Sequence, residues 1–269
     1  KIPIIILNAR ITKKSFKRWK IFDNFTKSIF GKISLALASN LETKNFLKKL
    51  STPKIKLAGN LKYYGSNNLK NLDTSSLRSK FRNFKIWCAA STHDGEEEII
   101  SKLHKTIKKR EKKLLTIIIP RHTYRAKKII KYLNQNNLKV ITHSSNQKLK
   151  KNTDIYLVDT YGETSKFYSL SNITFVGGSM IKHGGQNPLE PARLGNYIIN
   201  GPYISNFKEI YKFLVKNKLS LTTSNILTFK KFIEKKLNKK ISNQNRERLF
   251  KIGNKILNDN MLYLNNYIK

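Results

Sequence analysis

The sequence predicts an α/β protein with one complete Rossmann-like domain built on a parallel sheet, plus the back half of a second such domain. Short apolar runs alternate with amphipathic stretches over most of the 269 residues, which is the pattern of strands alternating with helices. Several apolar runs end in loops that contain glycine. Parallel sheets bind their ligands at the carboxyl ends of strands, so these loops are the candidate sites.

Residues 1–62 are expected to be a remnant, the C-terminal half, of an N-terminal Rossmann-like domain. Strands are expected at 2–7, 33–37 and 55–57, with helices at about 13–30 and 42–50. Three strands make a poor sheet and leave an apolar edge. Because the chain starts without Met and enters a strand almost at once, we expect that a preceding segment is absent. Residues 63–83 are expected to be an interdomain linker.

Residues 84–240 are expected to form the complete domain. Its strands are expected near 85–90, 114–119, 138–142, 154–158, 173–177 and 196–200, and its helices near 95–112, 123–136, 163–170 and 187–194. From about residue 206 onward the apolar positions follow helical spacing, and residues 241–269 are expected to form a C-terminal helix.

The formal net charge of +38 is the most unusual property of the composition. Such a basic chain is attracted to nucleic acid, to anionic membranes or to phosphorylated substrates. A genome rich in A and T, which favours Lys, Asn and Ile, accounts for part of this charge, because the lysines are scattered along the chain. No nucleic-acid-binding motif is present, so we do not expect nucleic acid as a partner.

Motifs for metals, cofactors and membrane spans are absent from the sequence. Cys88 is the only cysteine, which excludes a disulfide or a cysteine-based metal site. The five histidines have no metal-ligand spacing, and neither GxGxxG nor GxxxxGK[ST] occurs. We therefore expect no metal and no cofactor. No apolar run approaches the length of a membrane span, and there is no signal peptide.

The stretch 175–207 carries the most information about a site. An apolar strand pattern runs into Gly177-Gly178-Ser179, and a second glycine pair follows at Gly184-Gly185. Glycine turns let backbone N–H groups approach an anion closely, and a helix N-terminus favours negative charge. We therefore expect a phosphate or phosphodiester ligand here.

A helix start follows the second glycine pair. Asn187 is expected to be its N-cap and Pro188 its first residue, with Leu189 and Glu190 in the first turn. Glu190 has two interpretations: it closes a capping box with Asn187, or its carboxylate accepts hydrogen bonds from two ribose hydroxyls.

The loop after the strand at 85–90 is a second candidate. Ser91 or Thr92 is expected to cap a helix whose first turn holds three glutamates, Glu96, Glu97 and Glu98. Matching of these acidic side chains to the helix dipole explains them well. It does not explain His93, which we expect to face a ligand cleft.

Two further strand ends complete the set. Pro120 ends a strand, and Arg121 then projects from the carboxyl edge, where a guanidinium can hold a phosphate with two hydrogen bonds. The alternative is an ordinary surface arginine in a basic protein. The loop at Tyr161-Gly162-Glu163 follows another strand, and its glycine lets amide groups reach a flat base edge.

Together these motifs resemble the 3-deoxy-D-manno-octulosonic acid (Kdo) transferases of lipopolysaccharide assembly. The resemblance runs nearly from end to end of the chain, because the segments occur in the order of the family. They are Asn8-Ala9-Arg10, Gly59-Asn60-Leu61-Lys62, the segment from Trp87 to Glu98, Pro120-Arg121-His122, Asp159 to Glu163, Phe175 to Ser179, and Gly184 to Pro191.

The resemblance implies a GT-B glycosyltransferase, which has two Rossmann-like domains. It implies transfer of Kdo from CMP-Kdo to a lipid A precursor, with inversion at the anomeric carbon and CMP as leaving group. It also implies a peripheral location at the cytoplasmic face of the inner membrane, next to anionic lipid. The C-terminal helix would then pack back on the first domain.

The resemblance also implies which residues bind the donor. The residues expected to contact CMP are Pro120, Arg121, Tyr161, Gly162, Glu163, Asn187, Pro188, Leu189 and Glu190. A loop for the donor or its anionic groups is expected from Ser91, Thr92, His93, Gly177, Gly178 and Ser179.

The catalytic base is the main departure from the family pattern. In the family it is a glutamate in a loop near the start of the first domain, and no glutamate of this chain matches that motif. We therefore expect the base in the absent segment, which makes a separate N-terminal polypeptide a candidate partner and this chain inactive alone. Tyr161, Gln186 and Tyr203 replace the family's usual Met, His and His.

Two alternatives remain from the sequence. The first is another GT-B nucleotide-sugar enzyme, a UDP-sugar transferase or an epimerase. The second is a basic protein without catalysis that binds nucleic acid or a membrane surface, although charge alone does not account for the strand-end motifs.

Overall fold

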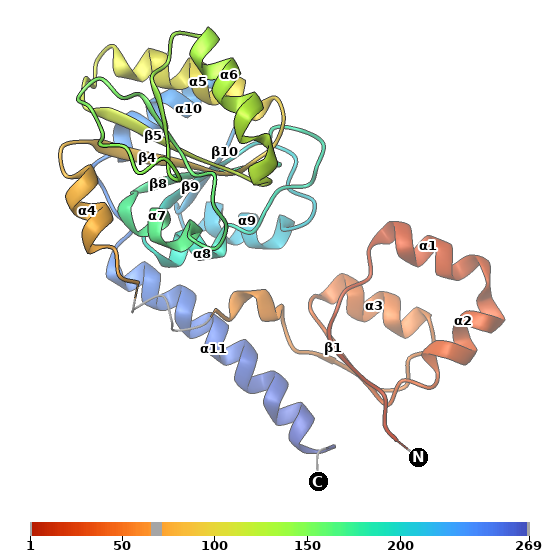
Figure 1. Ribbon diagram of the computed structural model, residues 1–269. Helices are drawn as coiled ribbons and strands as arrows, with labels where there is room; N and C mark the ends of the chain where they lie inside the picture. The colour runs from red at the N-terminus through yellow and green to blue at the C-terminus, as the bar shows by residue number, and fades with distance from the viewer. Residues whose placement is uncertain (1, 66–71, 268–269) are drawn as a thin grey trace. The chain divides into compact units, whose positions relative to one another are not determined.

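The computed structural model describes residues 2–65 and 72–267, and the chain divides into two compact units (Figure 1). The first unit contains Lys1–Ser66 and Glu247–Lys269, and the second contains Asn67–Arg246. The linker expected at 63–83 lies partly outside the described residues. Its later part differs from a linker, because helix α4 (Ser75–Phe81) buries Phe81 in the core of the second unit.

The first unit contains a small parallel sheet in the order β1-β2-β3. Its strands are β1 (Ile5–Ala9), β2 (Leu35–Ala38) and β3 (Ile55–Leu57), and its first helices are α1 (Lys13–Ile21), α2 (Asp23–Phe30) and α3 (Leu41–Lys49). The prediction of one helix over 13–30 is wrong, because Phe22 leaves the helical conformation with φ −110° and ψ 61°. This break folds α2 back, so that Trp19 packs edge-on against Phe30 at 5.2 Å between ring centroids.

The C-terminal helix α11 (Asn243–Asn265) covers the small sheet of the first unit. Tyr263 and Leu264 pack on Leu35 and Leu37 of β2. The amide of Asn260 donates to the carbonyl of Ala58 at 3.1 Å. The helix therefore supplies part of the core of a unit whose strands lie some 200 residues earlier.

The second unit contains a seven-stranded parallel sheet in the order β10-β9-β8-β4-β5-β7-β6. The strands are β4 (Lys85–Thr92), β5 (Leu114–Pro120), β6 (Val140–Thr142), β7 (Ile155–Leu157), β8 (Ile173–Val176), β9 (Tyr197–Asn200) and β10 (Ser220–Thr222). The chain builds from β4 toward β5 on one side and later returns to β8 on the other. The topological switch point, where such sheets bind ligands, therefore lies between β4 and β8.

Helices cover both faces of this sheet (Figure 1). On one face lie α5 (Glu96–Lys108), α6 (Ala126–Gln135) and α10 (Ile226–Lys236); on the other lie α4, α7 (Thr164–Leu170), α8 (Leu189–Arg193) and α9 (Lys208–Lys216). Strand β4 alternates between them: Trp87 and Ala89 pack against α5 and α10, whereas Cys88 and Ala90 pack on the side of α4 and α7. Because both faces are buried, the strand is apolar from Ile86 to Ala90.

Candidate functional site

The loops after β4 and β8 meet at the switch point. The amide of Gly177 donates to the carbonyl of Ala90 at 2.8 Å. A Cβ atom at Gly177 would lie 2.2 Å from the carbonyl oxygen of Ser91, so only glycine allows the two loops to approach this closely. The first of the expected anion-binding glycines is therefore required for packing between loops.

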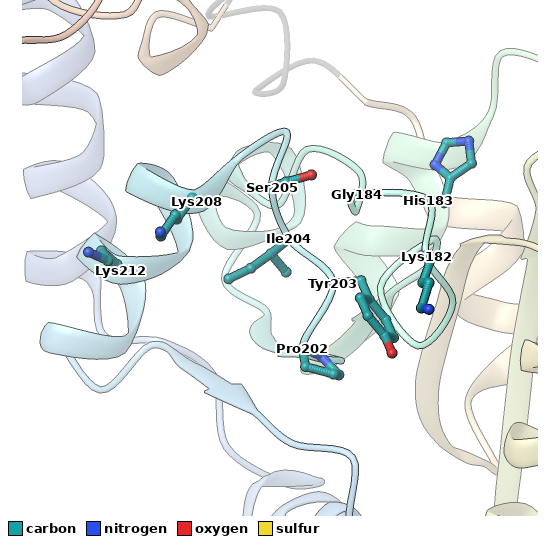
Figure 2. Close-up of a pocket in the computed structure, with 9 residues that line it drawn as sticks. All are labelled: Lys182, His183, Gly184, Pro202, Tyr203, Ile204, Ser205, Lys208 and Lys212. Carbon is teal, nitrogen blue, oxygen red and sulfur yellow. The ribbon is translucent and has the colours of Figure 1, made fainter. Parts of the chain in front are cut away.

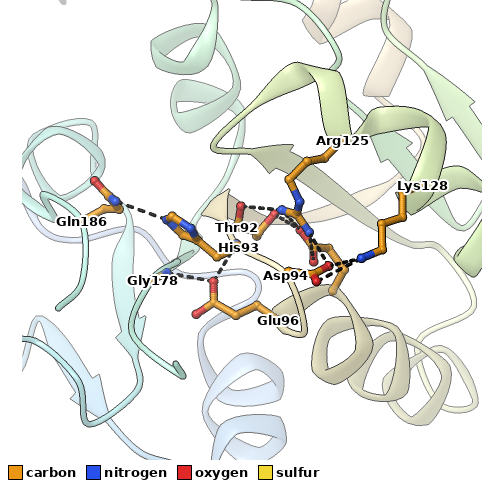
Figure 3. A network of polar contacts seen from close by, with 9 residues as sticks. Thr92, His93, Asp94, Glu96, Arg125, Lys128, Gly178 and Gln186 are labelled. Atoms are coloured by element: carbon orange, nitrogen blue, oxygen red, sulfur yellow. Dashed lines mark hydrogen bonds and ion pairs between the residues drawn. The ribbon is translucent and has the colours of Figure 1, made fainter. Parts of the chain in front are cut away.

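Glu96, the first residue of α5, occupies the amide groups of the turn after β8. Its buried carboxylate accepts hydrogen bonds from the backbone N–H groups of Gly178 at 2.8 Å and His93 at 2.9 Å (Figure 3). It also accepts from the backbone N–H groups of Ser179 and Met180 at 3.0 Å. This corrects the expectation that these amides are open to a ligand phosphate. An internal carboxylate already satisfies them.

The helix start after β4 also differs from the prediction. Strand β4 extends through Thr92, and Gly95, with φ 88°, is the N-cap of α5. Neither Ser91 nor Thr92 caps the helix. Instead the hydroxyl of Thr92 donates to the carboxylate of Glu97 at 2.7 Å, and the two side chains are buried together.

Arg125 is the residue at this site that sequence reasoning missed. It lies in the 3-10 turn η3 (Thr123–Arg125), and its guanidinium donates two parallel 2.9 Å hydrogen bonds to Glu97. It also donates to the Thr92 carbonyl at 3.1 Å and to Asp94 at 3.2 Å (Figure 3). A buried Glu97 needs such a partner, since an unpaired buried carboxylate is costly. Arg125 therefore stabilises the loop that follows β4.

His93 projects into a group of imidazoles at the carboxyl edge. Its ring centroid lies 4.1 Å from that of His183 and 6.4 Å from that of His122. Its Nε2 atom lies 3.4 Å from the side-chain nitrogen, Nε2, of Gln186. Burial lowers the pKa of His93 to about 4, and the neighbouring His183 and Arg125 act in the same direction. The imidazole is therefore neutral at pH 7.

Arg121 is the available cation of this edge. It follows Pro120 at the end of β5, and its amide donates to the Thr92 carbonyl at 3.0 Å, which holds the two strand ends together. Within the described part of the chain its exposed guanidinium makes no hydrogen bond or ion pair. Its charge is thus free for a ligand anion.

The loop between β7 and α7 presents Tyr161 and Gly162 to solvent. The side chain of Tyr161 is 72% exposed, and Gly162 has φ 86°. Glu163 is instead held by the protein: its carboxylate lies 2.8 Å from Nε2 of His143 and 3.1 Å from Nζ of Lys166. Burial acts to raise the pKa of Glu163, but the hydrogen bonds from Thr160 and Lys166 lower it.

The start of α8 is close to the predicted one. The N-cap is Pro188 and not Asn187, and the helix begins at Leu189 and not at Pro188. The side chain of Asn187 accepts a hydrogen bond from the amide of Leu189 at 3.2 Å. Glu190 does not close a capping box. It accepts a hydrogen bond from the hydroxyl of Ser165, which joins α8 to α7.

A pocket of about 520 Å³ adjoins the imidazole group, beyond the ends of β8 and β9 (Figure 2). Its lining residues are Lys182, His183, Gly184, Pro202, Tyr203, Ile204, Ser205, Lys208 and Lys212. No aspartate or glutamate is among them, so the pocket is basic.

Two absences concern the residues that the structure describes, 2–65 and 72–267. No group of three or more His, Cys, Asp or Glu side chains in these ranges is arranged to hold a metal ion. None of the helices found there has the length and apolar character needed to cross a membrane.

Comparisons with known proteins agree on one family. Residues 1–64 match the family model described as 3-deoxy-D-manno-octulosonic-acid transferase (kdotransferase). A 3-deoxy-D-manno-octulosonic acid transferase of Haemophilus influenzae is 36% identical over 267 residues, which are 96% of this chain and 61% of the relative. The chain thus spans less than two thirds of the length of that relative.

Two solved structures are similar to all or part of this chain. The C-terminal CMP-Kdo binding domain of WaaA from Acinetobacter baumannii is 28% identical with a TM-score of 0.59, covering 70% of this chain and 97% of that domain. HepE from Anabaena, solved with UDP and glucose, has a TM-score of 0.51 at 10% identity, covering 98% of this chain and 71% of that one. The second likeness shows the fold alone, which is of the GT-B type.

Proposed function

We propose that this chain, which belongs to the Kdo transferase family, binds CMP-Kdo as part of a glycosyltransferase that transfers Kdo to a lipid A precursor. One observation carries the proposal: 70% of this chain matches 97% of a CMP-Kdo binding domain. The exposed Arg121, at the end of β5 next to the switch point, supports it. Ligands of such sheets bind at that position.

The chemistry of the donor fits these residues. When the bond to Kdo breaks, CMP leaves with an additional negative charge on its phosphate. The Arg121 guanidinium is placed to stabilise this charge, and an arginine does so with two hydrogen bonds. We propose inversion at the anomeric carbon, which needs a base to take the proton of the acceptor hydroxyl. None of the glutamates described above is assigned that role.

The remaining strand-end residues are proposed to hold the cytidine and ribose. Tyr161 and Gly162 are exposed at the end of β7, so an aromatic face and free amides are available to the base. Pro120 shapes the end of β5. Glu163 and the segment Asn187, Pro188, Leu189 and Glu190 are held by hydrogen bonds and packing, and they are proposed to form a fixed wall.

The first unit supports a membrane surface as partner. Ile21, Phe22 and Phe25, at the junction of α1 and α2, are 73%, 65% and 62% exposed. Seven basic residues and one acidic residue lie between positions 13 and 32. Exposed apolar side chains within a basic surface suit the cytoplasmic face of an anionic inner membrane, where each lysine contributes about 1 kcal/mol.

Calorimetric titration with CMP and UMP tests the proposal. We expect CMP to bind more tightly than UMP, and Arg121→Ala to weaken CMP binding by about 10- to 100-fold, because a charge-assisted contact of about 1.5–3 kcal/mol is lost. Arg110→Ala, at an exposed arginine beyond the other end of α5, is the matched control and should change nothing. Absence of CMP binding would refute the proposal, and preference for UMP would favour a UDP-sugar enzyme.

A further inference from the structure

We propose that Glu96 is a positioning residue of the candidate site: a built-in carboxylate that fills the amide nest of the switch point and fixes His93 beside the ligand. Its side chain is completely buried. Oε1 accepts from the amides of Ser179 and Met180, and Oε2 accepts from those of Gly178 and His93, at 2.8–3.0 Å. The part concerning CMP rests on the proposed function.

The geometry requires the ionised carboxylate. All four partners are N–H donors, and a carboxylate can accept all four, whereas a protonated carboxyl would turn its own O–H toward a donor. Burial raises the pKa of Glu96, and the four amide donors act against that rise. Successive amides that converge on one point form an anion site, and here the chain supplies the anion itself.

The carboxylate joins the loop and helix after β4 to a turn that lies 82 residues later in the sequence. Glu96 belongs to α5, His93 to the loop after β4, and Gly178 to the turn after β8. That turn is held in place from its other side, because the hydroxyl of Ser179 accepts from the amide of Gly201 at 2.9 Å and donates to the Val176 carbonyl at 2.6 Å. Loss of the carboxylate would therefore release the loop of His93 more than the turn.

The imidazoles depend on this contact. A Cβ atom at Gly178 would lie 3.2 Å from ring atoms of both His93 and His183, so both rings rest against the glycine backbone. Because Glu96 binds the amides of His93 and Gly178 through the same oxygen, it fixes the spacing of ring and turn. Because these amides are occupied, the ligand anion would be bound by side chains such as Arg121.

Chemical rescue tests this role. We expect Glu96→Ala to lower CMP affinity at least tenfold, and added formate to restore most of it, because formate supplies two oxygens to the vacated amides. Glu96→Gln should also bind CMP more weakly, because its NH₂ group faces N–H donors. Formate should not restore its affinity, because the glutamine side chain fills the space. Glu98→Ala, at an exposed glutamate of the same helical turn, should bind CMP like the unaltered chain.

A second measurement does not depend on CMP. The imidazole NMR signals of His93 should shift in Glu96→Ala and return on titration with formate, but should stay unchanged in Glu98→Ala. If Glu96→Ala does not fold, Glu96→Asp should show intermediate His93 signals. Unshifted His93 signals in Glu96→Ala, or in Glu96→Asp where the alanine variant does not fold, would overturn the inference. A shift in Glu96→Ala that formate leaves unaltered would also overturn it. Failure of the unaltered chain to bind CMP would refute only the proposed function.

Discussion

His93 links the electrostatics of the site to the stability of the fold. Burial and its positive neighbours lower its pKa from 6.5 to about 4. The folded chain therefore prefers the neutral imidazole, while the unfolded chain takes up a proton below pH 6.5. This preference stabilises the fold fully above pH 6.5, and the stabilisation is lost as the pH falls from about 6.5 toward 4.

The corresponding prediction concerns His93→Asn. Denaturant unfolding measured between about pH 7.5 and 3.5, values chosen to span the window from about 6.5 to 4, should show a smaller loss of unfolding free energy at acid pH in this variant than in the unaltered chain. The asparagine keeps a polar side chain but has no group that titrates in this range. An identical pH dependence in the two proteins would show that His93 is not the group responsible.

The side chains of the site differ in how far the sequence could predict them. Arg121 and His93 were predictable, because they follow apolar strands directly and have no structural role there. Glu96 was predicted only as a match to the helix dipole, although its carboxylate binds the turn after β8, some 80 residues later. No pattern in the sequence indicated a role for Arg125. Its importance comes from the buried Glu97, and burial of a charge follows from tertiary packing.

At the scale of elements, Gly253 is a point of close approach between α11 and the backbone of Tyr63. A Cβ atom there would lie 2.2 Å from the carbonyl oxygen of Tyr63. Alanine favours a helix over glycine by about 1 kcal/mol, so elsewhere the change would stabilise. Here we expect Gly253→Ala to lower the unfolding free energy by about 1–3 kcal/mol, as overpacking does.

Chemical denaturation followed by circular dichroism measures this effect. Asn254→Ala, at the exposed neighbouring position of the same helix, provides the control and should leave stability the same or slightly higher. If the two variants proved equally stable, the close approach of α11 to Tyr63 could not be as the structure describes it.

The elements themselves were largely predictable, and the exceptions have physical causes. All six predicted strands of the large sheet are present within a few residues of their expected ends. Strand β10 was missed because Ser220–Thr222 contains a single apolar residue, Leu221, so no apolar run marks it in the sequence. The break at Phe22 was missed because the amphipathic spacing continues across it, and only the contact between Trp19 and Phe30 requires it.

At the scale of the whole molecule, two contributions to membrane binding have to be distinguished: the net charge of +38 and the exposed apolar side chains of the first unit. Charge alone draws the chain to any polyanion, including DNA, and this attraction falls steeply with salt. Apolar insertion is specific to lipid and resists salt. The two contributions therefore differ in their response to salt and to mutation.

Co-sedimentation with vesicles distinguishes them. We expect binding to anionic vesicles, weak binding to zwitterionic ones, and a component at high salt that Phe22→Ser with Phe25→Ser reduces about tenfold or more, because burying each ring contributes about 1.5–3 kcal/mol. Leu262→Ser removes a similarly exposed side chain, 66% accessible, from α11 and should have little effect. If duplex DNA bound as tightly as anionic lipid and the double variant bound normally, charge alone would explain the attraction, and the surface at α1 and α2 would have no part in it.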